Sequence, residues 1–232
     1  MKLKKQMKEV VLIVVAHPDD ETIGMGGSIK KHINKGDEVY VMSMTDGVGS
    51  RNLSSSKEVQ SRIESAKLAS ILLGFKWEKS YDFSDNKLDS YPLLEVVKCV
   101  EEAKSKYNPT IVYTHSNADL NIDHRVIANA VLTAFRPQPN ENCREIRLFE
   151  VPSATDYGNN IITGFFTPNL FISLEKEHWE AKLSALKAYK KEIRDYPHSR
   201  SLKSIQNLAK LRGNQIGVNM AESFQILRKI DN

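Results

Sequence analysis

The chain has 232 residues, of which 41% are hydrophobic and 27% charged, proportions that are ordinary for a soluble globular protein. Its net charge of +4 comes from 33 basic and 29 acidic residues spread along the sequence, so we do not expect a nucleic-acid-binding protein. The two cysteines, Cys99 and Cys143, form no CxxC pair, which disfavours a disulfide framework or a cysteine-based zinc site. Cys99 falls among the apolar residues of a helical pattern and is expected in the core.

The N-terminus has the pattern of a signal peptide, because an apolar run that ends at Ala16 follows Lys2, Lys4, Lys5 and Lys8. We interpret the run as a buried strand, since it is short and leads directly into a segment rich in polar side chains. No stretch of the sequence approaches the ~20 apolar residues that a membrane-spanning helix needs. We therefore expect a cytoplasmic protein without stable membrane insertion.

Segments typical of strands alternate with segments typical of helices along the chain. Within residues 59–73, for example, apolar residues recur at spacings of three and four, and Gly74 follows as a stop signal. Strands are predicted at residues 10–16, 38–44, 77–83, 111–114, 146–151 and 170–174, and helices at residues 24–34, 59–73, 92–107, 123–135, 177–193 and 202–211. This alternation predicts an α/β fold, in which helices cover both faces of a mostly parallel sheet.

Polar segments follow the first four predicted strands, at residues 17–21, 45–49, 84–89 and 115–124. Because ligands of parallel α/β sheets bind at the carboxyl ends of the strands, these segments are expected to share one rim. The sequence therefore predicts a single site at that rim.

The first of these segments, in the sequence Ala-His-Pro-Asp-Asp-Glu at residues 16–21, indicates a metal site. Adjacent carboxylates repel one another, and a carboxylate beside a core is unfavourable unless a cation or hydrogen bonds compensate it. Pro18 restricts the backbone, and we expect His17 and Asp20 to point to one place, with Asp19 near it. A catalytic zinc takes three protein ligands and a water, so a third ligand must come from elsewhere.

The other five histidines are the candidates for that ligand: His32, His115, His124, His178 and His198. His32 and His178 are expected at the surface. His124 is favoured over His115 because it opens a helix after the fourth strand. The neighbouring Asp123 could orient the imidazole or add negative charge to the site.

The two motifs together resemble the signatures of the LmbE-like (PIG-L) family of zinc-dependent N-acetyl sugar deacetylases. The first signature is present without change at residues 16–21, and the second is the Asp-His pair in Asn121-Ile122-Asp123-His124-Arg125. The similarity extends to the helix with Arg62 and Glu64, to Pro197-His198-Ser199-Arg200-Ser201, and to Ala221-Glu222-Ser223-Phe224. It covers essentially the whole chain and implies a single Rossmann-like, three-layer α/β domain over residues 1–232.

The resemblance implies one zinc ion per chain, bound by His17, Asp20 and His124. Asp19 would be the general base that takes a proton from zinc-bound water, whose pKa the metal lowers toward ~7. The hydroxide would attack the acetamide carbonyl, and Asp19 would return the proton to the leaving amine. Glu21 is expected to support the loop or the zinc site without taking part in the chemistry.

The resemblance also places Arg62 and Asp85 at positions that hold sugar hydroxyls. The alternatives are a surface arginine paired with a nearby glutamate and an ordinary turn residue. Many family members carry a second histidine three positions before the ligand histidine, where it stabilises the oxyanion. Here that position is Asn121, so the group that fills this role is open, with His198 and His115 as candidates.

The function predicted from these residues is hydrolysis of the acetyl group from an N-acetylglucosamine-type amino sugar or its conjugate. One alternative is a zinc amidase for another N-acyl sugar conjugate. Another is a metal- or sugar-binding protein without catalysis, against which Asp19 argues. The expected partner is a small amino-sugar molecule, and whether the protein forms a homo-oligomer is an open question.

Gly24, Gly26 and Gly27 do not match the GxGxxG motif of nucleotide-binding loops and are interpreted as sites of close packing. Residues 157–167 are interpreted either as a loop that covers the pocket or as an ordinary connection.

Overall fold

The computed structural model describes residues 8–49 and 56–231, and within them the strands form one seven-stranded sheet. The sheet order is β3-β2-β1-β4-β5-β7-β6. Neighbours among β1 to β5 pair in parallel, and β7 is antiparallel to both β5 and β6. The strands are β1 Val10–Val15, β2 Glu38–Thr45, β3 Lys76–Phe83, β4 Ile111–His115, β5 Glu145–Phe149, β6 Leu170–Ser173 and β7 Ala221–Lys229.

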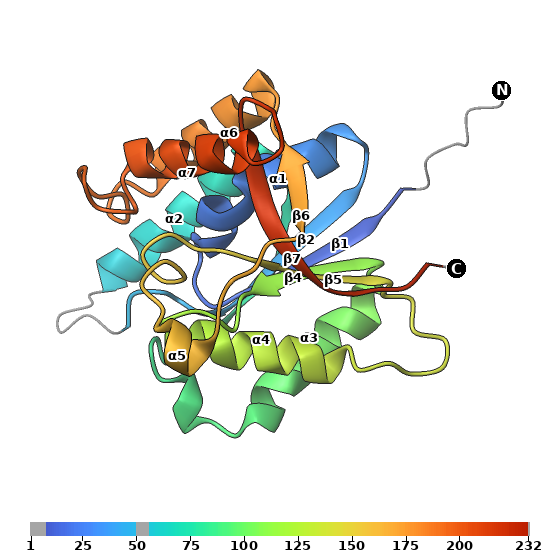
Figure 1. The fold of residues 1–232 in the computed structure, drawn as a ribbon. Helices are drawn as coiled ribbons and strands as arrows, with labels where there is room; N and C mark the ends of the chain where they lie inside the picture. Colours follow the sequence, from blue (N-terminus) through green and yellow to red (C-terminus); the bar gives the residue numbers. More distant parts are fainter. Residues whose placement is uncertain (1–7, 50–55, 232) are drawn as a thin grey trace, which may run out of the picture.

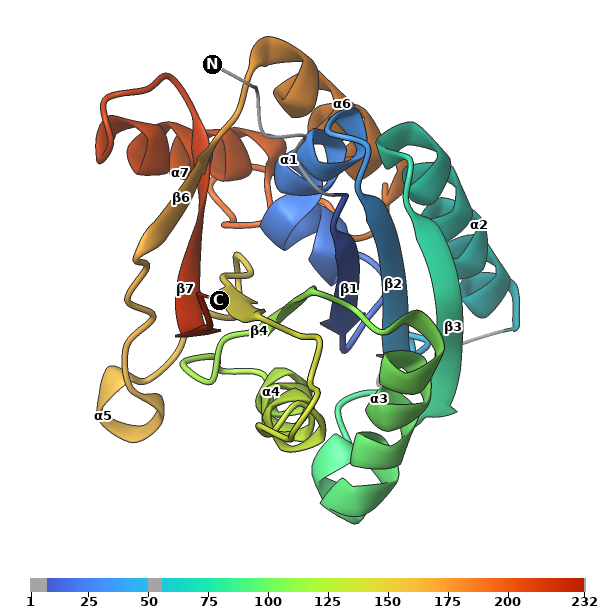
Figure 2. The same cartoon turned by 90° about the vertical axis from the view of Figure 1, so that its right-hand side faces the viewer.

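Helices cover both faces of this sheet, which confirms the predicted three-layer α/β fold (Figure 1 and Figure 2). One face is covered by α1, α2, α6 and α7, and the other by α3 and α4. The helices are α1 Asp20–Asn34, α2 Ser56–Leu73, α3 Leu93–Tyr107, α4 Ile122–Ala134, α5 Asn160–Thr163, α6 Lys176–Ala188 and α7 Leu202–Asn214. The long helices α1 to α4, α6 and α7 all correspond to predicted helices.

Strand β1 lies at the centre of the sheet and is buried on both sides. Val11, Ile13 and Val15 belong to the core under α1 and α2, whereas Leu12 and Val14 belong to the core under α3 and α4. A strand buried on both faces reads as an unbroken apolar run, which explains why this segment resembles a signal peptide. The lysines at positions 2, 4 and 5 lie outside the described residues, and no described helix has the length and apolarity needed to cross a membrane.

The C-terminal strand β7 is the one long element that the sequence patterns miss. It carries Glu222, a buried carboxylate that forms an ion pair with Lys182 at 2.6 Å. Helix α1 is interrupted at Met25 (φ −143°, ψ 22°), and the backbone amides of Gly27 and Ser28 just after this kink donate hydrogen bonds to Glu222 at 3.1 and 2.6 Å. Glu222 thus satisfies the free amides at the start of the second half of α1.

The glycines of α1 permit close packing, as predicted. A Cβ atom at Gly24 would lie 2.5 Å from the Phe149 ring, and one at Gly27 would lie 2.6 Å from Leu174. Helix α1 nevertheless begins at Asp20, four residues before its predicted start at residue 24. Carboxylates in a first turn interact favourably with the helix dipole, so the acidic segment can be helical itself.

Two histidines predicted at the surface are buried in the structure. Nδ1 of His32 lies 2.6 Å from the Asp37 carboxylate and Nε2 lies 2.9 Å from the Tyr113 hydroxyl. His178 accepts a hydrogen bond from the backbone amide of Glu175 and so closes a capping box at the start of α6. The surface prediction was wrong because each imidazole has polar partners that compensate its burial.

The two cysteines differ from the prediction in their burial. Cys99, expected in the core, is only partly buried on α3, and Cys143 is fully buried. Burial raises the pKa of the Cys143 thiol to about 11. Cys143 is therefore the inert core thiol, and Cys99 is the more accessible one.

Candidate active site

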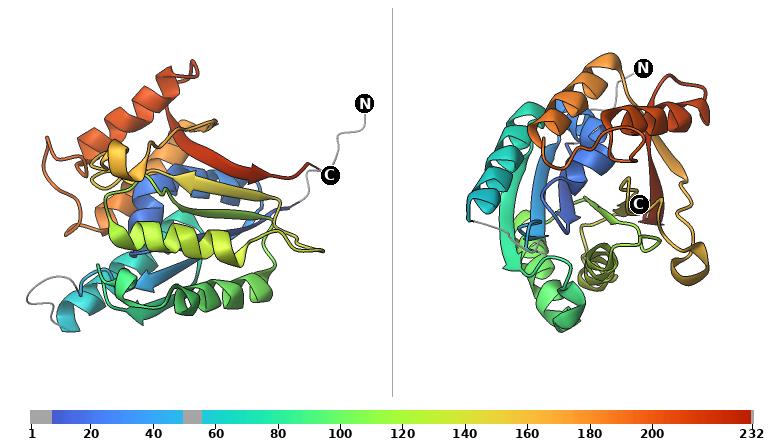
Figure 3. Two further views of the ribbon diagram at one scale, coloured as in Figure 1. Left: turned by 60° about the horizontal axis from the view of Figure 1, so that its bottom comes forward. Right: turned by 90° about the vertical axis from the view of Figure 1, so that its left-hand side faces the viewer.

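The loops after β1, β2, β3 and β4 meet at the carboxyl ends of the parallel strands, an edge that the right-hand view of Figure 3 faces. Strands β1 and β4 are neighbours although β2 and β3 lie between them in sequence, so the connections diverge at this point. Such a divergence is the usual place for a ligand in an open α/β sheet. The segment from His17 to Asp20 follows β1, and the segment from Asp119 to His124 follows β4.

His17, Asp20 and His124 form a buried cluster at this point. Oδ2 of Asp20 lies 3.1 Å from His17 Nδ1 and 3.3 Å from His124 Nε2, and these two nitrogens are 3.3 Å apart. The three ligand atoms thus lie close enough to surround one ion. Two imidazoles and one carboxylate are a ligand set that catalytic zinc takes in proteins.

The polar atoms of Asp20 also fit a cation. Its Oδ1 atom is buried and has no hydrogen-bond partner among the described residues. Burial opposes the negative charge of the Asp20 carboxylate, but the imidazoles of His124 and His17 hold the pKa of Asp20 well below its usual range. Burial likewise disfavours a charged imidazole at His124, yet the carboxylates of Asp20 and Asp119 raise its pKa to about 9. The cluster therefore favours positive charge, whether a proton or a metal ion supplies it.

Each imidazole of the cluster has a carboxylate on its other nitrogen. His124 Nδ1 lies 3.0 Å from Asp119 Oδ2, and His17 Nε2 lies 3.0 Å from Asp85 Oδ1. Carboxylates in this position orient metal-binding histidines. Asp119 was not identified from the sequence, and its only signal there is a place in the polar loop after β4, five residues before His124.

Asp123 does not contact the neighbouring imidazole of His124 but faces His17, at 3.4 Å from Nε2. Its carboxylate also accepts hydrogen bonds from the backbone amides of Asn86 and Leu88 at 2.7 and 3.0 Å. Asn121 caps α4 by accepting a hydrogen bond from the amide of Asp123, and its Nδ2 donates to Asn86 Oδ1 at 3.1 Å. Both side chains thus tie the loop after β3 to the start of α4.

Arg62 is buried and contacts the predicted base, so it is not the surface arginine that the sequence left as an alternative. Its Nη1 lies 2.8 Å from Asp19 Oδ2 and also donates to the carbonyl of Pro18, at 2.8 Å. Its Nη2 donates to the carbonyl of Gly47 at 3.0 Å and pairs with Glu192 at 2.9 Å. Burial raises the pKa of Asp19, and the charge of Arg62 opposes this shift.

Glu21 supports the same loop from behind. One carboxylate oxygen accepts a hydrogen bond from the backbone amide of Asp19 at 3.1 Å, and the other accepts from Thr22 and from the hydroxyl of Tyr189. Burial raises the pKa of Glu21 to about 8. The contacts agree with the supporting role expected from the sequence, and Tyr189 is a partner that the sequence did not indicate.

An open cavity of about 130 Å³ gives access to these groups. Its lining includes His17, Asp19, Arg62, Asp85, Asn121 and Arg200. Neither of the two histidines considered for the oxyanion role lines it within the described part of the chain. His115 is buried, stacks on His124 with ring centroids 3.8 Å apart, and accepts a hydrogen bond from the amide of Ala16. His198 accepts one from the backbone amide of Arg200.

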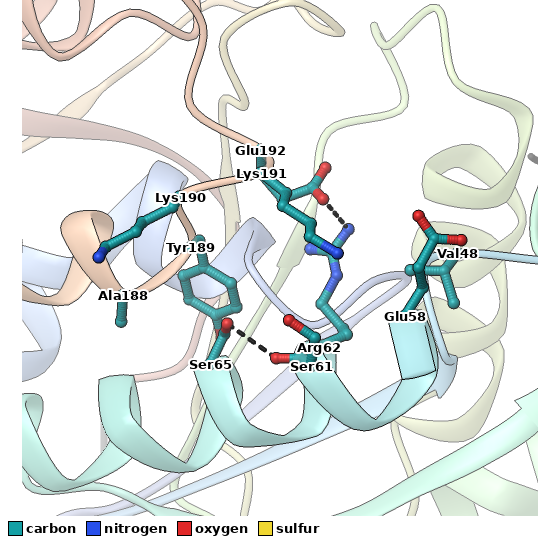
Figure 4. A pocket seen from close by; sticks show the side chains of 10 residues that line it. All are labelled: Val48, Glu58, Ser61, Arg62, Ser65, Ala188, Tyr189, Lys190, Lys191 and Glu192. Atoms are coloured by element: carbon teal, nitrogen blue, oxygen red, sulfur yellow. Dashed lines mark hydrogen bonds and ion pairs between the residues drawn. The ribbon is translucent and has the colours of Figure 1, made fainter. Parts of the chain in front are cut away.

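A second cavity of about 190 Å³ lies between α2 and the segment that follows α6 (Figure 4). Figure 4 shows Arg62 and Glu192 facing each other, with their ion pair as a dashed line. These two residues line both cavities, so the ion pair lies at the boundary between them.

The chain is similar to known deacetylases over most of its length. The family model PIG-L, described as GlcNAc-PI de-N-acetylase, matches residues 12–135. The chain is 28% identical over 185 residues to the uncharacterized deacetylase YaiS of Escherichia coli (78% of this chain, 90% of that protein). It is 28% identical over 193 residues to diacetylchitobiose deacetylase of Thermococcus kodakarensis (79% of this chain, 70% of that protein).

The structure is also similar to that of N,N'-diacetylchitobiose deacetylase from Pyrococcus horikoshii, with a TM-score of 0.75 at 26% identity. The superposition covers 95% of this chain and 84% of the other. A 4-carboxy-2-hydroxymuconate hydratase from Pseudomonas putida superposes with the same TM-score of 0.75 at 19% identity, covering 97% of this chain and 99% of that one. The hydratase shows that this fold also carries another reaction, so the fold alone does not decide the activity.

Proposed function

The chain belongs to the PIG-L family, and we propose that it is a zinc-dependent hydrolase that removes the acetyl group from an N-acetylated amino sugar or its conjugate. The observation that carries the proposal is the buried cluster of His17, Asp20 and His124, with the Asp19 carboxylate beside it in an open cavity. Relatives named as sugar deacetylases support the substrate class.

In this proposal His17, Asp20 and His124 hold one zinc ion. A zinc ion held there would supply Lewis acidity toward a carbonyl oxygen and a water molecule. Asp85 and Asp119 orient the two imidazoles through their second nitrogens.

Asp19 handles the proton. It accepts one from the attacking water as the oxygen–carbon bond forms, and it gives this proton to the amide nitrogen as the carbon–nitrogen bond breaks. The products are acetate and the free amine. Arg62, at 2.8 Å, keeps the carboxylate of Asp19 in place through a buried ion pair.

We propose that the sugar hydroxyls bind at Arg62 and Asp85, which both line the cavity. Both side chains already have partners, so a sugar hydroxyl at Arg62 would have to displace one of its contacts, and one at Asp85 would share the carboxylate with His17. We also propose that residues 1–232 form a single domain and that the protein is cytoplasmic. Whether it forms a homo-oligomer stays an open question.

The test is acetate release from a panel of N-acetyl amino sugars by the purified protein, together with metal analysis. We expect one zinc per chain and release of acetate from at least one N-acetylglucosamine derivative. Release of a different acid from other N-acyl sugars would favour the amidase alternative. Binding of metal and sugar without release of any acid would identify a binding protein and contradict the proposal.

A further inference from the structure

Amide hydrolysis places negative charge on the acyl oxygen, and a site that accelerates it aims hydrogen-bond donors at that oxygen. The polar groups of the cavity can be sorted by whether they already have partners. Asn121 is largely committed, because its amide oxygen caps α4 and one of the two N–H groups of its amide nitrogen donates to Asn86, which leaves one uncharged N–H for a ligand. A neutral N–H stabilises developing negative charge less than a charged donor does.

Arg62 is also committed. Both of its terminal nitrogens donate to backbone carbonyls, of Pro18 and Gly47, and both take part in ion pairs, with Asp19 and Glu192. An additional acceptor would have to displace one of these buried contacts.

Arg200 differs from Arg62 in this respect. Its Nε donates to the hydroxyl of Ser153 at 2.5 Å and to the carbonyl of Pro152 at 3.3 Å, which fixes the plane of the guanidinium. Its terminal nitrogens make no hydrogen bond to other described residues, and Nη1 lies 3.7 Å from Asp19 Oδ2. A donor at this distance has room to serve an acceptor that binds beside Asp19.

The chain around Arg200 is built to hold this orientation. Its backbone amide donates to His198 Nδ1 at 3.0 Å, and Ser201 next to it caps α7 by accepting from Ser204. Ser153, which accepts from Nε, adopts a left-handed backbone conformation (φ 70°) that is unfavourable for a residue with a side chain. The turn that contains Ser153 is closed by the backbone amides of Ala154 and Thr155, which donate to the carbonyl of Val151 at 3.1 and 2.9 Å, and it keeps Ser153 in place as the anchor of Arg200.

We propose that Arg200 is a catalytic residue that donates a hydrogen bond from its terminal guanidinium nitrogens to the acyl oxygen as negative charge develops there. This inference rests on the proposed function. It gives His198 a positioning role, because the imidazole holds the turn from which Arg200 reaches the cavity. It also explains how the site can work with Asn121 committed to capping.

Three variants test the role: Arg200→Ala, Arg200→Lys and, as a matched control, Arg194→Ala, an exposed arginine of the same segment. For Arg200→Ala we expect kcat to fall about 10²–10³-fold, as for loss of an oxyanion donor, with KM changed less than about threefold. Arg200→Lys keeps the charge but loses the planar fork, and we expect an intermediate kcat. Added guanidinium should restore part of the activity of Arg200→Ala.

A binding measurement separates this role from a structural one. Calorimetry compares a methylphosphonamide of the amino sugar, which mimics the tetrahedral state, with the product amine. We expect Arg200→Ala to weaken binding of the mimic by about the same factor as kcat/KM and to leave product binding unchanged. Equal weakening of both ligands, or a kcat within about twofold of the parent, would overturn the role of Arg200. A parent protein that releases no acetate would instead overturn the proposed function, and with it this role.

Discussion

Nδ1 of His124 lies 3.0 Å from Oδ2 of Asp119, and the same oxygen accepts a hydrogen bond from the hydroxyl of Thr155 at 2.9 Å. The other oxygen of Asp119 accepts from the backbone amide of Asn121 at 2.9 Å. The carboxylate is thus fixed by Thr155 and Asn121, and it in turn fixes the imidazole so that Nε2 faces Asp20. In this geometry Asp119 determines which nitrogen of His124 is available to a metal.

Replacing this carboxylate should weaken metal binding. We expect Asp119→Asn to lower the zinc affinity about 10–100-fold, because the amide cannot stabilise the required tautomer of His124 as strongly. Competition with a chromogenic chelator measures the affinity. Asp89→Asn, at an exposed position outside the cluster, is the control. An unchanged affinity in Asp119→Asn would mean that the Asp119 contact does not determine the geometry of the ligand.

Loss of the predicted base should separate turnover from metal binding. We expect Asp19→Asn to reduce kcat by about 10²–10⁴-fold, because the amide cannot accept the proton of the water. The zinc content and melting temperature should stay close to those of the parent, since Arg62 keeps the counter-charge of Glu192 and asparagine keeps an oxygen for it. Steady-state kinetics and metal analysis of the same sample check both points. Near-normal deacetylation by this variant would show that another group is the base.

The two stacked histidines after β4 should differ in their effect on the metal. We expect His124→Ala to lose most of the zinc, since it removes one of three ligands. His115→Ala should retain it, because the Nε2 atom of His115, which lies 3.5 Å from Asp20 Oδ2, is engaged by the hydrogen bond that it accepts from the amide of Ala16. Metal analysis after gel filtration compares the two variants. Full zinc occupancy in His124→Ala, together with loss of zinc in His115→Ala, would show that His115 and not His124 is the third ligand.

The sequence indicated the centre of the site because its signals are local. The strand that ends at residue 15 directs the following polar residues to the rim, and the short spacing of His17 and Asp20 limits how far apart they can lie. The contacts of Asp119 and Arg200 depend on how irregular loops fold, and no periodic pattern encodes them. They could therefore be found only once the loops after β4 and β5 and the turn before α7 were placed.

The errors in the fold have a similar cause. Strand β7 has buried polar residues, Glu222 and Ser223, between apolar ones, so it lacks the alternation that identifies a half-buried strand. His32 and His178 are polar residues on helices and were assigned to the surface. Partners distant in sequence or at a helix cap satisfy them instead. Pairing between buried polar groups is a tertiary property that a single sequence does not display.

The contact of Asp37 with His32 should make stability depend on pH. Partial burial opposes ionisation, but hydrogen bonds from His32 and the amide of Glu9 lower the pKa of Asp37 below its usual value. A depressed pKa stabilises the fold above the unfolded-state pKa, and the contribution disappears as the pH falls through the folded-state pKa. We expect Asp37→Asn to be less stable than the parent near pH 5, and we expect a smaller gap at about pH 2.5, which is below the usual pKa of an aspartate. Urea unfolding at both pH values measures the gap, and a constant gap would contradict the assignment.

The ion pair of Glu222 and Lys182 should be important for the stability of the kinked helix α1. Both side chains are almost completely buried, at 4% and 3% exposure. In Glu222→Gln the ammonium of Lys182 stays buried without a counter-charge, and the amides of Gly27 and Ser28 compete for one acceptor oxygen. We expect a loss of about 3–5 kcal/mol in the free energy of unfolding, measured by urea denaturation.

A second substitution tests whether the unpaired charge is the cause. In the double variant Lys182→Met with Glu222→Gln the buried cation is gone, so we expect it to be more stable than Glu222→Gln alone by at least about 1 kcal/mol. Glu180→Gln breaks an exposed pair with Lys176 on α6 and should change stability by less than about 0.5 kcal/mol. If Glu222→Gln were as mild as Glu180→Gln, the pair would contribute little and the packing of the α1 glycines against Phe149 and Leu174 would have to hold the kink.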